Sequence, residues 1–205
     1  MYARLLWLSD VLDAAVSLVG RLAAWLALAL IAVIMLDVIT RRLFVLGSTR
    51  LQELEWHLHG TLLLLVIGFA YLRNAHVRIE IFREQMSPRG RAIVEMIGCL
   101  LLIAPFCWLM VNSGYTYAYR AFVVGEGSPA LTGLPHRFII KGMIPLGFAL
   151  VAMAALAVFA RCFVFAFGPA ALRQRAGAIV ADVTLVESGA TGPDAVDERR
   201  EGPGT

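Results

Sequence analysis

The sequence predicts an all-α integral membrane protein with four transmembrane helices, an amphipathic segment at the membrane interface before the second helix, and a disordered C-terminal tail. Two observations carry this prediction. Of the 205 residues, 60% are hydrophobic and only 16% are charged, and the mean hydropathy is +0.76, whereas about 25% of the residues of a soluble domain are charged. The apolar residues are also gathered into four long blocks, each close to the roughly 20 residues that a helix needs to cross the hydrocarbon core.

The four blocks cover residues 18–40, 54–72, 93–115 and 142–167. Because every backbone amide inside lipid must be bonded within its own segment, we expect each block to form a helix. Together the blocks make a membrane domain of residues 18–167.

The first block is expected to be retained and not removed as a signal peptide. It is longer than the apolar core of a signal, which has about 7–15 residues. It also ends in Asp37, Arg41 and Arg42 and lacks a small-residue cleavage site. Residues 1–17 are then a cytoplasmic N-terminal segment.

A polar stretch with the sequence LQELEWHLH, residues 51–59, opens the second helix. On a helix its leucines form one stripe, while its acids and histidines form i, i+4 pairs on other faces. These pairs are Glu53 with His57 and Glu55 with His59. Charges are costly at bilayer depth, so two interpretations stay open: the stretch lies at the interface with Trp56 as its anchor, or it faces a protein partner.

The histidines do not predict a metal or haem site. His57 and His59 are two positions apart, whereas a zinc pair on a helix needs i, i+3 or i+4 spacing. His76 and His136 fall in predicted connections, so no opposed histidine pair is available at mid-membrane for haem. No nucleophile stands beside a positioned base. The sequence therefore predicts no catalytic, metal or cofactor residues, and no binding to nucleic acid.

The distribution of arginine predicts that both termini are cytoplasmic, by a modest margin. One side of the membrane would carry Arg73, Arg78, Arg83, Arg89, Arg91, Arg173 and Arg175. The other side would carry Arg41, Arg42, Arg50, Arg120, Arg137 and Lys141. In the second connection, Arg73, His76 and Arg78 are expected either to pack against the cytoplasmic ends of helices or to meet anionic lipid head groups.

Residues 168–205 are predicted to form a cytoplasmic tail. From Arg173 onward the tail is rich in Gly, Ala, Asp and Glu with almost no aromatic residue, which leaves too little apolar surface to offset chain ordering. Disorder is the expectation, with folding on binding as the alternative. The three cysteines lie in or beside apolar blocks, and their odd number argues against a disulfide framework, so we interpret them as small buried hydrophobic residues.

Three short motifs lie between the expected helices. They are HVRIE at residues 76–80, the pair Glu126 and Ser128, and KGMIPLG at residues 141–147, which contains Lys141, Pro145 and Gly147. Their order and spacing resemble those of the small membrane subunit, DctQ type, of tripartite ATP-independent periplasmic (TRAP) transporters, over about residues 19–167. The LQELEWH run at residues 51–57 resembles one branch of that family. The sequence departs from the pattern at Phe138, where many members have tryptophan, and at Glu80, where aspartate is common.

The resemblance implies a small permease subunit in the bacterial inner membrane that braces a large membrane subunit of the DctM type. The large subunit would import an organic acid with a sodium gradient, after a periplasmic substrate-binding protein has captured it. The residues expected to contact a partner subunit, lipid or a neighbouring helix are Glu53, Glu55, Trp56, His57, Arg73, His76, Arg78, Glu126, Lys141, Pro145 and Gly147. Two other classes remain as alternatives: the membrane anchor of a respiratory enzyme and a stand-alone transporter.

Overall fold

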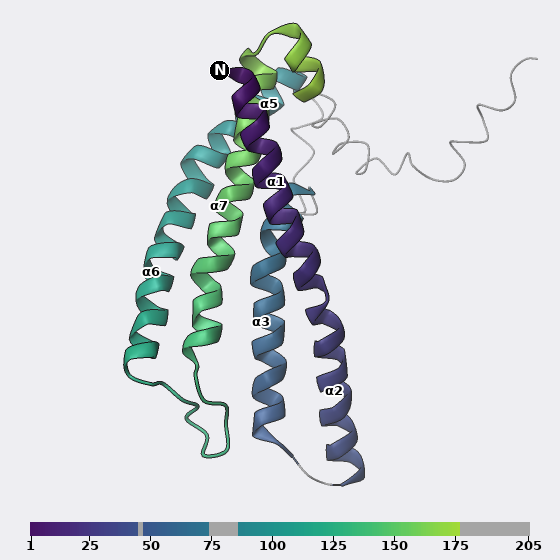
Figure 1. The fold of residues 1–205 in the computed structure, drawn as a ribbon, viewed down its shortest axis with the longest axis vertical. Coiled ribbons are helices and arrows are strands. Elements are labelled where there is room, and N and C mark those ends of the chain that lie inside the picture. The colour runs from purple at the N-terminus through teal and green to yellow at the C-terminus, as the bar shows by residue number, and fades with distance from the viewer. Residues whose placement is uncertain (45–46, 74–85, 177–205) are drawn as a thin grey trace, which may run out of the picture.

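The computed structural model describes residues 1–44, 47–73 and 86–176, which form long helices joined by short connections (Figure 1). The helices are α1 (Tyr2–Ala24), α2 (Leu26–Leu43), α3 (Thr49–Leu72), α5 (Pro88–Gly98), the π-helical turn η1 (Cys99–Ile103), α6 (Ala104–Val123) and α7 (Phe138–Phe167). Residues 170–176 add a short helical segment, and the described residues contain no strand.

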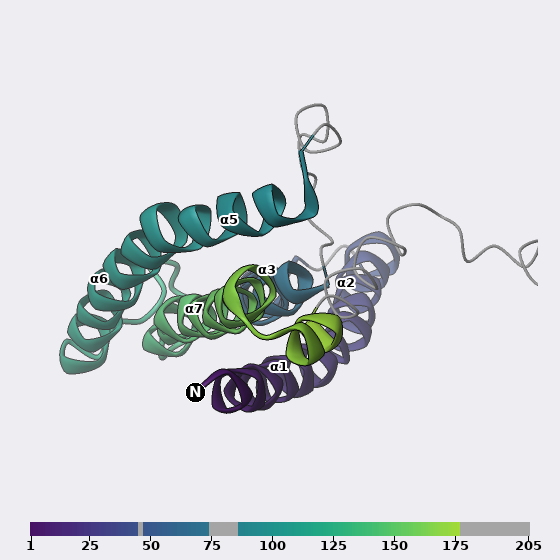
Figure 2. The ribbon, with the colours of Figure 1, turned by 90° about the horizontal axis from the view of Figure 1, so that it is seen from above.

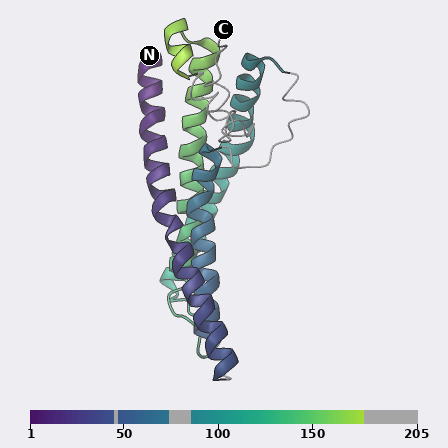
Figure 3. The same ribbon diagram turned by 90° about the vertical axis from the view of Figure 1, so that its right-hand side faces the viewer.

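These elements combine into four rods that are each long and apolar enough to cross a membrane. The first rod is α1 with α2, the third is α5 with η1 and α6, and α3 and α7 are one rod each. The prediction of an all-α membrane protein with four spanning helices is confirmed. Met1 and residues 168–176 lie at one end of the bundle, the terminal end, and the α6–α7 loop lies at the other, the loop end (Figures 1 and 3).

The first rod starts at Tyr2, well before the predicted start at residue 18. Leu6 and Val16 on one face of α1 are buried, and the Ser9 hydroxyl donates a hydrogen bond to the Ala157 carbonyl of α7 (3.2 Å). Packing of one face stabilises this part of the helix without a continuous apolar run. The apolar block at 18–40 therefore marked only the more apolar half of the rod.

The polar stretch at residues 51–59 is continuous with the second rod. α3 begins at Thr49, where the Ser48 side chain accepts a hydrogen bond from the Leu51 backbone N–H (3.4 Å), and it runs unbroken to Leu72. The stretch thus stands in line with the helix and does not form a separate element lying flat. Within this stretch, Glu53 turns into the bundle, where it is only 5% exposed.

α7 is the central rod, with α6, α3 and α1 packed around it (Figure 2). The main hydrophobic core joins α1, α3 and α7, and its buried members are Val16, Leu72, Leu150, Ala154 and Ala157. α2 packs chiefly on α3, and Asp37 is its one buried residue. The outer surfaces of the rods expose large apolar side chains, as expected for helices that meet lipid.

Glycines bring the backbones of α3 and α7 into contact. A Cβ built on Gly147 would lie 2.6 Å from the Leu64 carbonyl oxygen, and one on Gly68 would lie 3.0 Å from the Leu150 carbonyl. Small residues at crossings permit this close approach, on which helix association in membranes depends. The two rods are therefore held at a fixed short separation.

The chain continues past α7 in a short helical segment at residues 170–176, which lies within the predicted tail of 168–205. Leu172 and the buried Ala176 pack with Leu6 of α1 and Val164 of α7 in a second small core at the terminal end. The remaining predicted tail, residues 177–205, lies outside the described residues.

Replacing Gly147 by alanine should destabilise the protein, because the new Cβ would meet the α3 backbone at Leu64. Overpacking of this kind costs about 1–3 kcal/mol, so we expect the Tm of the detergent-purified chain to fall by several degrees. Gly142→Ala is the matched control, since a Cβ there meets no atom within 4 Å and alanine favours a helix. Equal Tm values for the two variants would contradict the close α3–α7 packing.

Candidate functional site

The loop end of the bundle gathers several of the residues singled out in the sequence. Glu53 and Trp56 come from α3, Glu126 comes from the α6–α7 loop, and Lys141 comes from the first turn of α7. Each contacts another of these segments. The site is therefore built from three parts of the chain that are distant in sequence.

Glu53 is the centre of this arrangement. Its Oε1 accepts a hydrogen bond from the Ser128 hydroxyl, and its Oε2 accepts one from the Leu134 backbone N–H (2.6 Å). The Arg137 guanidinium lies 3.6 Å from Oε1. Hydrogen bonds to a charged acceptor are stronger than neutral ones. One carboxylate on α3 thus holds two parts of the α6–α7 loop, at Ser128 and Leu134, and the residue that precedes α7.

Trp56 extends the same contact along α3. The Arg137 guanidinium lies over the Trp56 ring, 5.6 Å from its centroid, a separation at which a cation is attracted to an aromatic face. Trp56 is 55% exposed, so its outer side is open to lipid or a partner. We call Glu53, Trp56, Ser128, Arg137 and the Leu134 N–H the loop clamp.

The loop has a fixed shape that fits the loop clamp. α6 ends in a Schellman motif, in which Gly125 has φ 64° and the Glu126 N–H donates to the Ala121 carbonyl (2.9 Å). The Ser128 N–H donates to the Leu134 carbonyl (3.1 Å). Gly133 is needed for the close approach, because a Cβ there would lie 2.1 Å from the Ser128 hydroxyl oxygen.

Lys141 makes a second link beside the loop clamp. Its ammonium pairs with the Glu126 carboxylate and lies 3.9 Å from the centroid of the Tyr117 ring on α6. The Arg137 N–H also donates to the Glu126 carbonyl oxygen (3.0 Å). Lys141 thus ties α7 to α6 and to the loop at once.

The other predicted residues have varied placements. Pro145 lies where α7 crosses α6, since a Cβ on Gly114 would meet the Pro145 ring at 3.0 Å. The His57 ring nitrogen Nδ1 contacts the Glu53 carbonyl oxygen (2.5 Å). Glu55 lies two positions from Glu53, on another face of α3. His76 and Arg78 lie outside the described residues.

Arg73 belongs to a second polar group at the terminal end. Its guanidinium donates to the Ser17 hydroxyl (3.3 Å), which donates in turn to Asp13 (2.9 Å). Asp13 also accepts from Arg161 of α7 (2.7 Å), an arginine that is only 8% exposed. We call Asp13, Ser17, Arg73 and Arg161 the terminal cluster, which joins α1, α3 and α7.

Sequence reasoning missed Arg161, Asp13 and Arg137 as partners. Arg161 is the one charge within the apolar run of α7, and an arginine at that depth needs a partner. That signal could have drawn attention to it. The identity of its partner depends on α1 lying against α7, which no local pattern indicates.

The loop clamp and terminal cluster mark two polar layers. Two rods carry charged residues 20 positions apart: Glu53 with Arg73 on α3, and Lys141 with Arg161 on α7. Twenty residues of helix rise about 30 Å, which equals the thickness of the hydrocarbon core, about 30 Å. This spacing suits charges that lie at the two borders of one membrane-thick apolar layer.

The charged groups of this site link segments of the chain to one another through ion pairs. In the loop clamp, the Lys141–Glu126 link and the terminal cluster, each acid is paired with an arginine or lysine of another segment. Among the described residues, no group of three or more His, Cys, Asp or Glu side chains could hold a metal ion. The arrangement fixes the positions of the rods relative to one another at both borders.

The chain matches a known family of proteins. Residues 30–165 match the family described as tripartite ATP-independent periplasmic transporters, DctQ component. The matched region is well over half of the chain and includes the loop clamp and the Lys141–Glu126 pair, while Asp13 and Ser17 precede it. No curated protein matches the sequence.

Replacing Glu53 by alanine should loosen the α6–α7 loop, because the Ser128 hydroxyl, the Leu134 N–H and Arg137 would lose their acceptor. We expect a lower Tm in detergent and faster cleavage by protease within residues 124–137. Glu55→Ala removes the same charge two positions away and should leave both values near those of the wild type. Matching behaviour of the two variants would show that the loop clamp does not hold the loop.

Replacing Gly133 by alanine should displace the same loop through a change in the loop itself and not in α3. The new Cβ would lie 2.1 Å from the Ser128 Oγ and 2.8 Å from the Glu53 carboxylate, and relieving such a clash costs about 1–3 kcal/mol. Thermal unfolding measures the loss. Gly127→Ala lies in the same loop with no atom within 4 Å of its Cβ and serves as control; a Gly133→Ala variant as stable as this control would exclude the tight fit.

Proposed function

The chain belongs to the DctQ component family of tripartite ATP-independent periplasmic (TRAP) transporters, and from this membership we propose that it is the small membrane subunit that braces the large membrane subunit, DctM type, of such a transporter. The large subunit would carry an organic acid into the cell with a sodium gradient, after delivery by a periplasmic substrate-binding protein. The observation that carries the bracing role is the attachment of the rods to one another at both borders of the apolar layer.

Rigidity is what a brace needs, and several features support it. α3 and α7 touch along their backbones at Gly147 and Gly68. The loop clamp fixes them at the loop end, and the terminal cluster joins both to α1 at the other end. Ion pairs that leave water are costly to separate once formed. A bundle tied in this way resists sliding or tilting of one rod against the next.

The distribution of charge favours support of a partner over transport by this chain alone. Transport sites in membrane proteins are built from interrupted helices and from polar groups near the bilayer midplane. Here α3 is continuous, and α7 continues through Pro145. The charges of the loop clamp and terminal cluster lie near the borders and are paired within the chain. We therefore assign the substrate path to the large subunit.

We propose that the bundle lies in the bacterial inner membrane with its terminal end in the cytoplasm. Arginines gather at that end, and among them are Arg4, Arg73, Arg89 and Arg91. Basic residues are retained on the cytoplasmic side of membranes. The loop clamp would then face the periplasm, where the substrate-binding protein docks on the transporter.

The first test is co-purification of the full chain, tagged at its C-terminus, from native membranes in mild detergent. We expect one larger polytopic membrane protein to remain bound in stoichiometric amount, because the bracing role requires a stable complex. Mass spectrometry identifies the partner, and membranes from cells with the untagged chain give the background.

Other bound partners would contradict the proposal. A haem-bearing or soluble catalytic partner would make this chain the anchor of an enzyme. A stable oligomer of this chain alone, with substrate uptake in vesicles, would make it a stand-alone transporter.

A further inference from the structure

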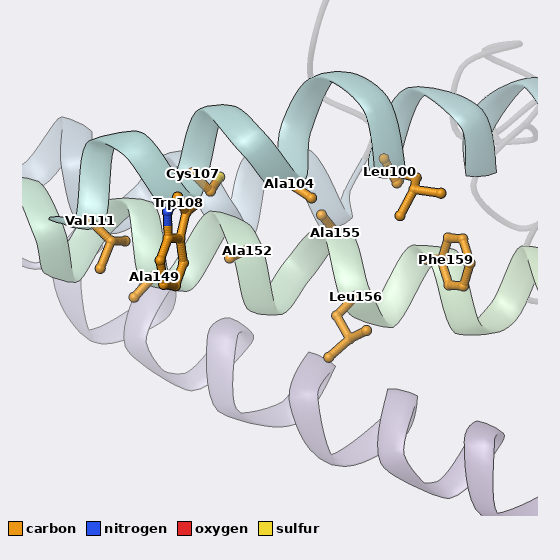
Figure 4. Close-up of a pocket in the computed structure, with 11 residues that line it drawn as sticks. Leu100, Ala104, Cys107, Trp108, Val111, Ala149, Ala152, Ala155, Leu156 and Phe159 are labelled. Carbon is orange, nitrogen blue, oxygen red and sulfur yellow. The ribbon is translucent and has the colours of Figure 1, made fainter.

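The third rod and α7 enclose an apolar groove on the side of the bundle (Figure 4). Its volume is 520 Å³. One wall comes from η1 and α6 and the other from α7. The lining residues are Cys99, Leu100, Ala104, Cys107, Trp108, Val111, Ala149, Ala152, Ala155, Leu156 and Phe159.

The shape of the groove follows from its small residues and from the π-helical turn. Ala149, Ala152 and Ala155 make a low wall along α7, and Ala104 faces them from α6 (Figure 4). η1 lies where the third rod passes from α6 to α5, and π-turns inside helices often occur at functional sites. No charged side chain lines the groove, so its contents must be apolar.

The length of the groove along α7 matches the thickness of one leaflet of the bilayer. Its α7 wall runs from Ala149 to Phe159, which is about 15 Å of helix and so about half of the roughly 30 Å hydrocarbon core. Phe159 lies two positions from Arg161 at the terminal border, and Ala149 lies near the middle of the stretch between Lys141 and Arg161. The groove therefore spans the leaflet nearer the terminal end.

The length and the apolar lining of the groove suit a single hydrocarbon chain. We propose that the groove holds one acyl chain of a phospholipid from the leaflet at the terminal end. This inference depends only on the position of the chain in a membrane and is independent of the transporter role.

A basic residue is available for the phospholipid head group. Arg89 is exposed in the first turn of α5, beyond the terminal border of the apolar layer. It lies on the same face of the rod as Ile93 and the groove residue Leu100, at i, i+4 and i+11. An arginine at this level attracts the phosphate of a lipid whose chain enters the groove.

Filling the groove tests the proposal. The double variant Ala104→Leu and Ala152→Leu adds side chains to both walls, whereas Ala29→Leu and Ala32→Leu adds the same atoms to exposed positions of α2. Native mass spectrometry of the full chain, purified in mild detergent, measures the fraction that carries one phospholipid. If the new side chains keep about two methylene groups of the acyl chain out of the groove, the retention of lipid should weaken about tenfold in the groove variant. The α2 variant should retain lipid as the wild type does.

Three other outcomes overturn the proposal. Equal retention in both double variants places the lipid elsewhere, and a retained quinone gives the groove another ligand. Loss of the large membrane subunit from the groove variant, with lipid retention unchanged, assigns the groove to a partner helix. If the groove variant fails to fold, phospholipid is added back to delipidated wild-type protein: a rise in Tm that saturates at one lipid per chain supports the site, and no rise excludes it.

Discussion

The fold depends on one constraint: a charged group can lie near the apolar layer only if it is paired and placed at the border. The structure meets it twice, at levels about 30 Å apart on the rods. At the loop end Glu53 holds Ser128, the Leu134 N–H and Arg137. At the terminal end Asp13 holds Arg161. Between these levels, association rests on close packing of small residues, because lipid offers no hydrophobic drive for helices to meet. The position of each rod follows from these two kinds of contact.

The central place of α7 explains both the rigid and the open parts of the bundle. Where glycine or proline lies at a crossing, as at Gly147 and Pro145, α7 meets α3 and α6 directly. Farther toward the terminal end, a row of alanines on α7 faces η1 and α6 across the apolar groove. Small side chains allow neighbouring helices to approach closely, but they leave an open space where the neighbouring helix does not approach α7. A brace that needs a continuous outer surface in the membrane would have this space filled by lipid.

Several residues stood out in the sequence for physical reasons, whereas their partners did not. Glu53 and Trp56 stood out because an acid and an indole at the start of an apolar helix need an explanation. The choice between an interfacial position and a protein contact stayed open, and the structure turns Glu53 into the bundle and leaves Trp56 half exposed. The partners Ser128 and Arg137 lie more than seventy residues away. Contacts between residues so far apart in sequence depend on which rods pack together, and the hydropathy of the sequence does not encode that pairing.

By itself, the sequence determined that this protein lies in a lipid bilayer, how many helices span it, and to which family the chain belongs. The reason is that the length of each apolar block and the content of charged residues can be read from the chain without knowing which helices meet. Tertiary structure alone decided that α1 extends to Tyr2, that Arg161 meets Asp13, and that a groove opens beside α7. The physical reason is that helix ends, ion pairs and grooves depend on which faces of different rods come together. One face of α1 is buried only because α7 lies beside it, and Arg161 is neutralised only by that same contact.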